Sequence, residues 1–199
     1  MIVEAVAAIR AGRPVVLPTD TVYGLCADPG REAPARVVAR LKGRSELQPT
    51  ALLARDVETL FDSVPELRQH SAVVRALVPG PYTLILPNPG GRYPWLTGDN
   101  PGAIGVRVPV LEGPGAEVLG RVGVVLATSA NLHGGPDPRR LDEVPEEIRR
   151  GCGALVDGGE LPGRPSTVLD LTGPEPKILR EGAVPGAEAL NVLAATAGG

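Results

Sequence analysis

Aromatic side chains are scarce in this chain of 199 residues, at 3% of the composition. Proteins that bind single-stranded nucleic acid stack successive bases on aromatic rings, so the composition disfavours that class. Positive charge is not in excess either, because 20 lysine and arginine residues stand against 23 acidic ones, a net charge of -3. Binding to a phosphate backbone would therefore need a local cluster of basic side chains.

Cysteine and histidine are rare as well. Cys26 and Cys152 are too few for a disulfide framework and lack the spacing of a zinc site, which indicates structural thiols in a reducing compartment. His70 and His133 form no Ser-His-Asp or Cys-His pattern, and a surface position is the simpler interpretation of each. Because no His, Cys and carboxylate cluster has metal-ligand spacing, we expect no dedicated metal site.

Long apolar runs are missing too. No stretch approaches the roughly 20 apolar residues that cross a bilayer. The first ten residues contain Glu4 and lack the basic segment of a signal peptide. We therefore expect a soluble, cytoplasmic protein with no membrane contact, and its length with 43% hydrophobic residues suits one domain.

The apolar pattern predicts an α/β fold. Short β-branched runs bounded by proline or glycine indicate strands at 14–18, 50–54, 82–86, 103–108, 123–127, 154–156, 166–171 and 178–179. Helical spacing is found at 2–11, 34–41, 56–60, 65–77, 115–119 and 145–150. The elements alternate without regular strand–helix–strand spacing, which favours a twisted, open, mixed sheet with flanking helices. Residues 188–199 are mostly small, and we expect them to fray.

Polar residues gather at six places, most of them at the ends of predicted strands, where open α/β sheets build binding sites. These places are residues 19–25, 42–44, 107, 128–131, 166–167 and 180–182. The glycine-rich segments 134–135 and 158–159 lack the ending of a P-loop, and no dinucleotide-binding glycine motif follows the first strand. A nucleotide would have to bind by another scheme.

Each cluster also has a purely structural interpretation. Threonine and aspartate after the first strand are typical of turns. Lys42 and Arg44 are typical of a solvated helix end, where a lysine adds little stability. Ser129 and Asn131 suit a turn cap as well as a grip on phosphate or ribose oxygens. Arg107, inside an apolar strand, needs either an anion or an exposed strand face.

Taken together and in order, the clusters resemble the YrdC-like family of threonylcarbamoyl-AMP synthases. The matching segments are 18–25 (PTDTVYGL), 42–44 (KGR), 79–83 (PGPYT), 95–98 (WLTG), 106–109 (VRVP), 129–131 (SAN), 166–168 (STV) and 179–182 (LREG). The resemblance implies a YrdC/RibB-like domain over residues 1–187 with a concave cavity. It also implies that L-threonine, bicarbonate and ATP are converted to L-threonylcarbamoyladenylate and pyrophosphate.

The resemblance further implies which residues bind each substrate. The family positions that hold L-threonine correspond here to Thr19, Arg107, Ala127 and Ser166. Those on the nucleotide side correspond to Lys42, Arg44, Ala103, Ser129, Asn131 and Arg180. Catalysis would rest on positioning and on the charges of Lys42 and Arg44, with Mg²⁺ carried by the ATP phosphates and no protein nucleophile. The product would pass to a tRNA threonylcarbamoyltransferase complex that modifies tRNA position 37, and tRNA itself is a possible contact.

Two segments differ from the family pattern, and they leave alternatives open. Residues 45–50 replace a proline-rich segment after Arg44, and His133 stands where the family has a small residue. A YrdC-like paralogue without synthase activity is one alternative, and a double-stranded RNA-binding or ribosome-associated module is another. Carbamoyl-adenylate chemistry of hydrogenase maturation is a third, which the two cysteines disfavour because that chemistry occurs in much longer chains with zinc fingers.

Overall fold

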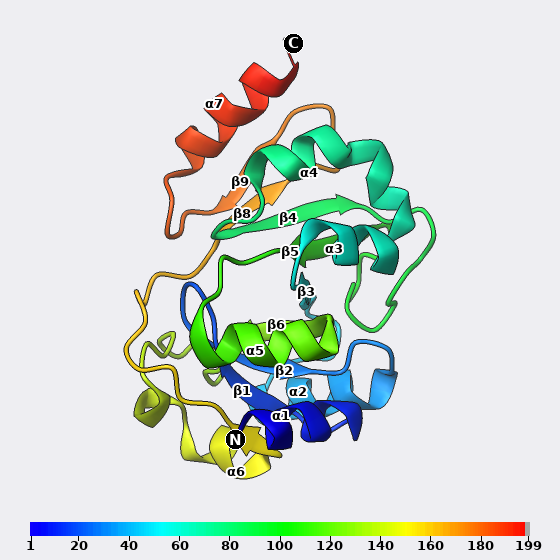
Figure 1. The fold of residues 1–199 in the computed structure, drawn as a ribbon. Coiled ribbons are helices and arrows are strands. Elements are labelled where there is room, and N and C mark those ends of the chain that lie inside the picture. The colour runs from blue at the N-terminus through cyan, green and yellow to red at the C-terminus, as the bar shows by residue number, and fades with distance from the viewer. Residues whose placement is uncertain (198–199) are drawn as a thin grey trace.

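One sheet of nine strands runs through the computed structural model, which describes residues 1–197 (Figure 1). Its spatial order is β7-β1-β2-β6-β3-β5-β4-β8-β9. The strands are β1 (Val15–Pro18), β2 (Tyr23–Ala27), β3 (Ala51–Ala54), β4 (Tyr82–Pro87), β5 (Ala103–Arg107), β6 (Val124–Ser129), β7 (Ala154–Leu155), β8 (Thr167–Asp170) and β9 (Lys177–Arg180). Three neighbouring pairs are parallel (β1 with β7, β3 with β5, β4 with β8) and the rest antiparallel, which confirms the predicted open mixed sheet.

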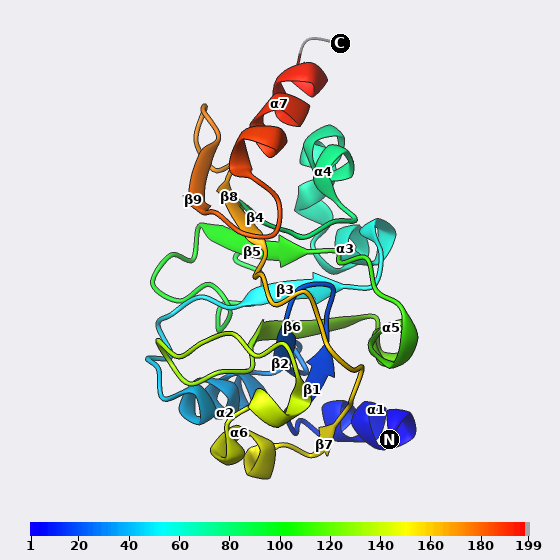
Figure 2. The same cartoon turned by 90° about the vertical axis from the view of Figure 1, so that its left-hand side faces the viewer.

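The helices flank this sheet. They are α1 (Ile2–Arg10), α2 (Glu32–Lys42), α3 (Val57–Ser63), α4 (Ser71–Leu77), α5 (Gly113–Val122), α6 (Glu146–Gly151) and α7 (Gly186–Ala197), with 3-10 turns η1 (Pro65–His70) and η2 (Leu141–Glu143). The helix predicted over 65–77 is thus divided into η1 and α4. In Figure 2, α3, α4 and α5 lie along one side of the sheet, and α1 and α7 lie at opposite ends of the molecule. Among residues 1–197, no helix has the length and apolar character needed to traverse a bilayer.

The buried apolar residues form two clusters. The larger joins α2, α3, α4 and α7 to strand residues such as Leu52, Leu84 and Val106. The smaller lies under α1 and α5 and contains Leu17 and Val125. All residues of β1 and β2 are buried, as expected of central strands whose two faces are both covered. Packing in these clusters fixes the positions of the strands that carry the polar residues.

The strand β2 was missed by the sequence pattern, in which residues 19–24 suit an ordinary turn. In the structure the turn covers only residues 19–22, and Tyr23–Ala27 pairs with β1 on one side and β6 on the other. The physical reason is that a hydroxyl closes the chain reversal early. The Thr19 Oγ1 accepts hydrogen bonds from the backbone N–H groups of Thr21 and Val22, both at 3.3 Å.

The prediction of a frayed tail is wrong for residues 188–197. These residues belong to α7, which contacts α4 and buries Ala189 and Leu193. Alanine and leucine are strong helix formers, and contact with α4 supplies the stability that the isolated segment lacks. The domain boundary predicted at residue 187 falls inside this helix. Residues 198–199 lie outside the described residues.

Candidate functional site

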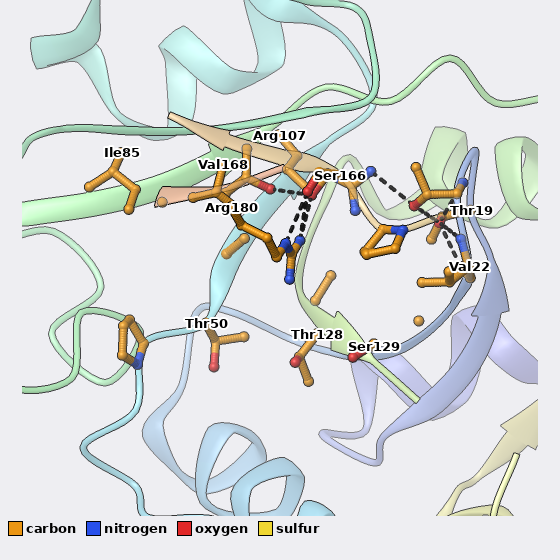
Figure 3. A pocket seen from close by; sticks show the side chains of 18 of the residues that line it. Thr19, Val22, Thr50, Ile85, Arg107, Thr128, Ser129, Ser166, Val168 and Arg180 are labelled. Carbon is orange, nitrogen blue, oxygen red and sulfur yellow. Dashed lines mark hydrogen bonds between the residues drawn. The ribbon is translucent and has the colours of Figure 1, made fainter. Parts of the chain in front are cut away.

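A cavity of about 300 Å³ opens on the sheet, as the resemblance implied (Figure 3). Strands β2, β3, β4, β5, β6 and β8 supply its walls, together with the turn after β1 and the segment before β8. Space is left because five of the strand residues that line it are small, namely Gly24, Ala51, Ala103, Gly105 and Ala127. In Figure 3, Ile85 lies toward one end of the cavity and Thr19 toward the other.

The structure brings seven of the ten predicted site residues to this cavity. They are Thr19, Ala103, Arg107, Ala127, Ser129, Ser166 and Arg180. The other three, Lys42, Arg44 and Asn131, do not line it. The lining residues come from positions 19 to 180 of the chain, so only the folded sheet assembles them.

Arg107, at the end of β5, forms an ion pair with Asp20. Its Nη2 donates to Asp20 Oδ1 at 2.8 Å and makes a longer contact of 3.4 Å with Thr21 Oγ1. The side chains of Arg107 and Asp20 are only 11% and 9% exposed. Burial raises the pKa of Asp20, and the charge of Arg107 opposes this rise. Among the described residues Arg107 Nη1 has no hydrogen-bond partner, so it remains available to a ligand.

Thr19 both lines the cavity and shapes it. Its hydroxyl donates to the carbonyl oxygen of Val22 at 2.6 Å. Thr19 Oγ1 also accepts hydrogen bonds from the two backbone N–H groups of the turn. The Oγ1 atoms of Thr19 and Thr21 are 3.1 Å apart. The residue therefore holds the turn in shape at the end of the cavity where Arg107 lies.

Ser166 and Arg180 are in direct contact although the resemblance assigned them to different substrates. Arg180 projects from β9, and its Nε and Nη2 donate to the Ser166 carbonyl oxygen at 3.1 and 2.8 Å. Its Nη2 also lies 3.1 Å from Ser166 Oγ. That hydroxyl is in turn 2.7 Å from Thr83 Oγ1. Figure 3 shows Ser166 and Arg180 between the two ends of the cavity.

Lys42 ends α2 and is buried, with 4% of the residue exposed. Its Nζ donates to the carbonyl oxygens of Ser129 at 2.6 Å and Asn131 at 2.8 Å, and to Asn131 Oδ1 at 2.8 Å. All three ammonium donors are thereby used. Burial, reinforced by the charge of nearby Arg44, lowers the pKa of Lys42 to about 8. The interpretation of Lys42 as part of a solvated helix end is therefore wrong.

Asn131 and Arg44, like Lys42, contact residues of the cavity wall without lining the cavity. Asn131 Oδ1 also accepts from Ser129 Oγ at 2.6 Å, and its Nδ2 donates to the Gly135 carbonyl oxygen at 2.6 Å. The Arg44 guanidinium donates to the hydroxyl of Thr50, which lines the cavity. Its Nε is buried and has no partner among the described residues. These side chains therefore do not line the cavity, but they form hydrogen bonds with Thr50 and Ser129, which do.

Several polar residues of the site were given no role from the sequence, although its polar clusters 19–25 and 128–131 contain three of them. They are Asp20, which pairs with Arg107, and the lining residues Thr21, Thr50, Thr83, Thr97, Asn100 and Thr128. Four of them stand inside the quoted segments 18–25, 79–83 and 95–98. The segments were a signal for these four residues, but a motif does not show which of its side chains face one cavity.

Neither thiol lines the cavity. Burial raises the pKa of Cys26 and of Cys152 to about 12. Within residues 1–197, no three His, Cys, Asp or Glu side chains gather closely enough to hold a metal ion.

Two known proteins that are similar in sequence to this chain carry the same name. A threonylcarbamoyl-AMP synthase of Stenotrophomonas maltophilia is 37% identical over 162 residues, which are 78% of this chain and 84% of that protein. One of Methylococcus capsulatus is 42% identical over 130 residues, covering 64% of this chain and 68% of the other.

A solved structure is also similar. The crystal structure of P. abyssi Sua5 complexed with L-threonine superposes with a TM-score of 0.84 at 32% identity. The superposition covers 96% of this chain and 57% of that longer one. Residues 7–182 match the family described as Sua5_yciO_yrdC, telomere recombination. The chain therefore belongs to the Sua5/YciO/YrdC family.

Proposed function

We propose that this protein is an L-threonylcarbamoyladenylate synthase, which makes that adenylate and pyrophosphate from L-threonine, bicarbonate and ATP. The observation that carries the proposal is the buried guanidinium of Arg107, which keeps Nη1 unbonded at the wall of a cavity large enough for small ligands. The names of the two bacterial relatives and the threonine complex of the P. abyssi protein support it.

On the threonine side, we assign the carboxylate to Arg107. A guanidinium presents a planar set of donors that matches a carboxylate, and here one nitrogen is already fixed by Asp20. Ser166 adds a hydroxyl, and Thr19 and Ala127 add a small polar and a small apolar surface nearby. Together these four residues suit a small amino acid with a polar side chain.

On the nucleotide side, Ala103, Ser129 and Arg180 line the cavity and would contact ATP directly. Arg180 is exposed and is the cation best placed to meet phosphate groups. Lys42 and Asn131 would act from behind Ser129, Lys42 through its charge and both through their hold on the wall. Arg44 would act in the same way through Thr50.

The chemistry proposed for these residues needs no covalent intermediate with the protein. The amine of L-threonine attacks bicarbonate and water leaves, which gives a carbamate. A carbamate oxygen then attacks the α-phosphorus of ATP, and the bond to the leaving pyrophosphate breaks. Mg²⁺ enters with the ATP phosphates as part of the substrate and neutralises the leaving group. The adenylate would then be consumed by a tRNA-modifying enzyme.

Product analysis tests the proposal. The protein is incubated with MgATP, L-threonine and bicarbonate, and nucleotides and pyrophosphate are quantified. Pyrophosphate should appear only when threonine and bicarbonate are both present, and AMP rather than ADP should form when the adenylate breaks down. Release of ADP and phosphate, or pyrophosphate without bicarbonate, would overturn it. A double-stranded RNA-binding module would instead bind RNA with an affinity that falls steeply with salt.

A further inference from the structure

Asp20 contacts Arg107 but does not itself line the cavity. Arg107 lines the cavity, whereas Asp20 lines a separate surface concavity together with Glu112 and Pro162. The carboxylate therefore does not face a bound ligand. It can act on the ligand only through Arg107 and through its own charge.

The charge matters because the cavity is otherwise purely cationic. Among its described lining residues, Arg107 and Arg180 are charged and none is acidic. Burial lowers the pKa of Arg107, the charge of Asp20 opposes this, and the nearby charge of Arg180 lowers the pKa further. If neither were neutralised, the two charges in this partly buried site would attract a polyanion strongly. ATP and pyrophosphate are polyanions, and both would then compete for the Arg107 end.

We propose that Asp20 is a specificity-determining residue, which neutralises Arg107 so that its end of the cavity accepts a zwitterionic amino acid and rejects phosphate groups. An amino acid carries its own positive charge and loses little when Asp20 cancels the field of Arg107. A triphosphate or pyrophosphate loses most of its attraction. The polyanion is left with Arg180, and the two substrates are kept in separate halves of the cavity. This inference rests on the proposed function, because it takes L-threonine as the amino acid.

The test is a competition measured with Asp20→Asn. Asparagine keeps an oxygen that can accept from Arg107 but removes the charge. The dissociation constant of L-threonine is measured by calorimetry at rising concentrations of pyrophosphate. For the unmodified protein it should stay constant, because pyrophosphate binds elsewhere. For Asp20→Asn it should rise with pyrophosphate, reaching about tenfold at the highest concentration, as expected of direct competition.

Two variants serve as controls. Asp28→Asn breaks an aspartate–arginine pair of the same 2.8 Å length, with Arg31, that is more exposed and does not line the cavity. It should behave as the unmodified protein. Asp20→Glu keeps the negative charge and should restore a threonine affinity that is independent of pyrophosphate. A merely structural role for Asp20 would weaken threonine binding without creating competition.

Three results would overturn the inference. One is a threonine affinity of Asp20→Asn that does not respond to pyrophosphate. Another is competition by pyrophosphate in the unmodified protein, a measurement that needs no variant to fold. The third, no binding of L-threonine to the unmodified protein, would remove the proposed function as well. The first two leave the proposed function standing, so the two failures are distinguishable.

Discussion

The guanidinium of Arg107 lies 2.8 Å from the carboxylate of Asp20, although the two residues are 87 positions apart in the chain. One ends strand β5 and the other belongs to the turn after β1. The pair is buried, so loss of either partner leaves an uncompensated charge, which typically costs about 3–5 kcal/mol. A substitution here affects binding and stability together, and both must be measured.

Arg107→Lys should weaken the binding of L-threonine by about 1–3 kcal/mol, the size of a lost charge-assisted hydrogen bond. A lysine keeps the charge and can pair with Asp20, but it has no second planar nitrogen to offer a ligand. The affinity for ATP should change much less. Calorimetric titration with each substrate measures the difference, and equal losses for both would contradict the assignment of Arg107 to threonine.

Gly105→Val should abolish turnover while leaving the melting temperature nearly unchanged. A Cβ at this position would have no neighbour closer than 3.8 Å, and because Gly105 lines the cavity, the added side chain should occupy space that a ligand needs. Gly120→Ala is the matched control, because a Cβ there meets nothing within 4 Å and the residue lies in α5. Pyrophosphate release and thermal unfolding are followed for both. Full activity of Gly105→Val would place the reaction outside this cavity.

Lys42→Met should lower the free energy of unfolding by several kcal/mol and also slow turnover. The variant removes the ammonium donor from the carbonyl oxygens of residues 129 and 131, at about 1–3 kcal/mol for each group left buried and unpaired, while Asn131 Oδ1 keeps its hydrogen bond from Ser129 Oγ. Lys177, the other lysine of the chain, is exposed, and Lys177→Met should alter neither quantity. Urea titration gives the stabilities. A Lys42 variant as stable as the control would show that the buried hydrogen bonds contribute nothing.

Both thiols should be inert in the folded protein. Their pKa of about 12 leaves a thiolate fraction on the order of one in ten thousand at pH 8, and the thiolate is the form that reacts. Iodoacetamide should therefore modify neither Cys26 nor Cys152 in native buffer, and both in urea, as judged by the mass of the intact chain. Rapid native modification at either position would argue for a locally open structure.

The sequence showed that a buried charged side chain needs a partner, but it did not show the direction in which every charged side chain points. An arginine inside an apolar strand needed either an anion or an exposed strand face, and the structure supplies an anion, Asp20, from a segment already quoted for the resemblance. The direction of Lys42 could not be read in the same way. A lysine at a helix end turns outward to solvent or inward to carbonyl groups according to its neighbours in space, and those neighbours are 87 and 89 positions away.

The two missed elements share a related cause. The chain reversal before β2 is closed within four residues, so its polar pattern hid the start of the strand. The helix α7 depends on contact with α4, which lies more than a hundred positions earlier. Long, strongly patterned elements such as α2 and β6 needed no such information and were predicted close to their observed limits.

The cavity wall joins the first hairpin of the chain to its last pair of strands, since Thr19 and Arg180 both line it. A ribosome-bound chain therefore has no complete binding site until β9 has emerged, and substrate cannot assist the folding of the earlier strands during synthesis. Under the proposed function, L-threonine bound between Thr19 and Ser166 would connect an early part of the sequence to a late one. At a ligand concentration a hundred times its dissociation constant, that connection adds about 2.7 kcal/mol to the work of separating them.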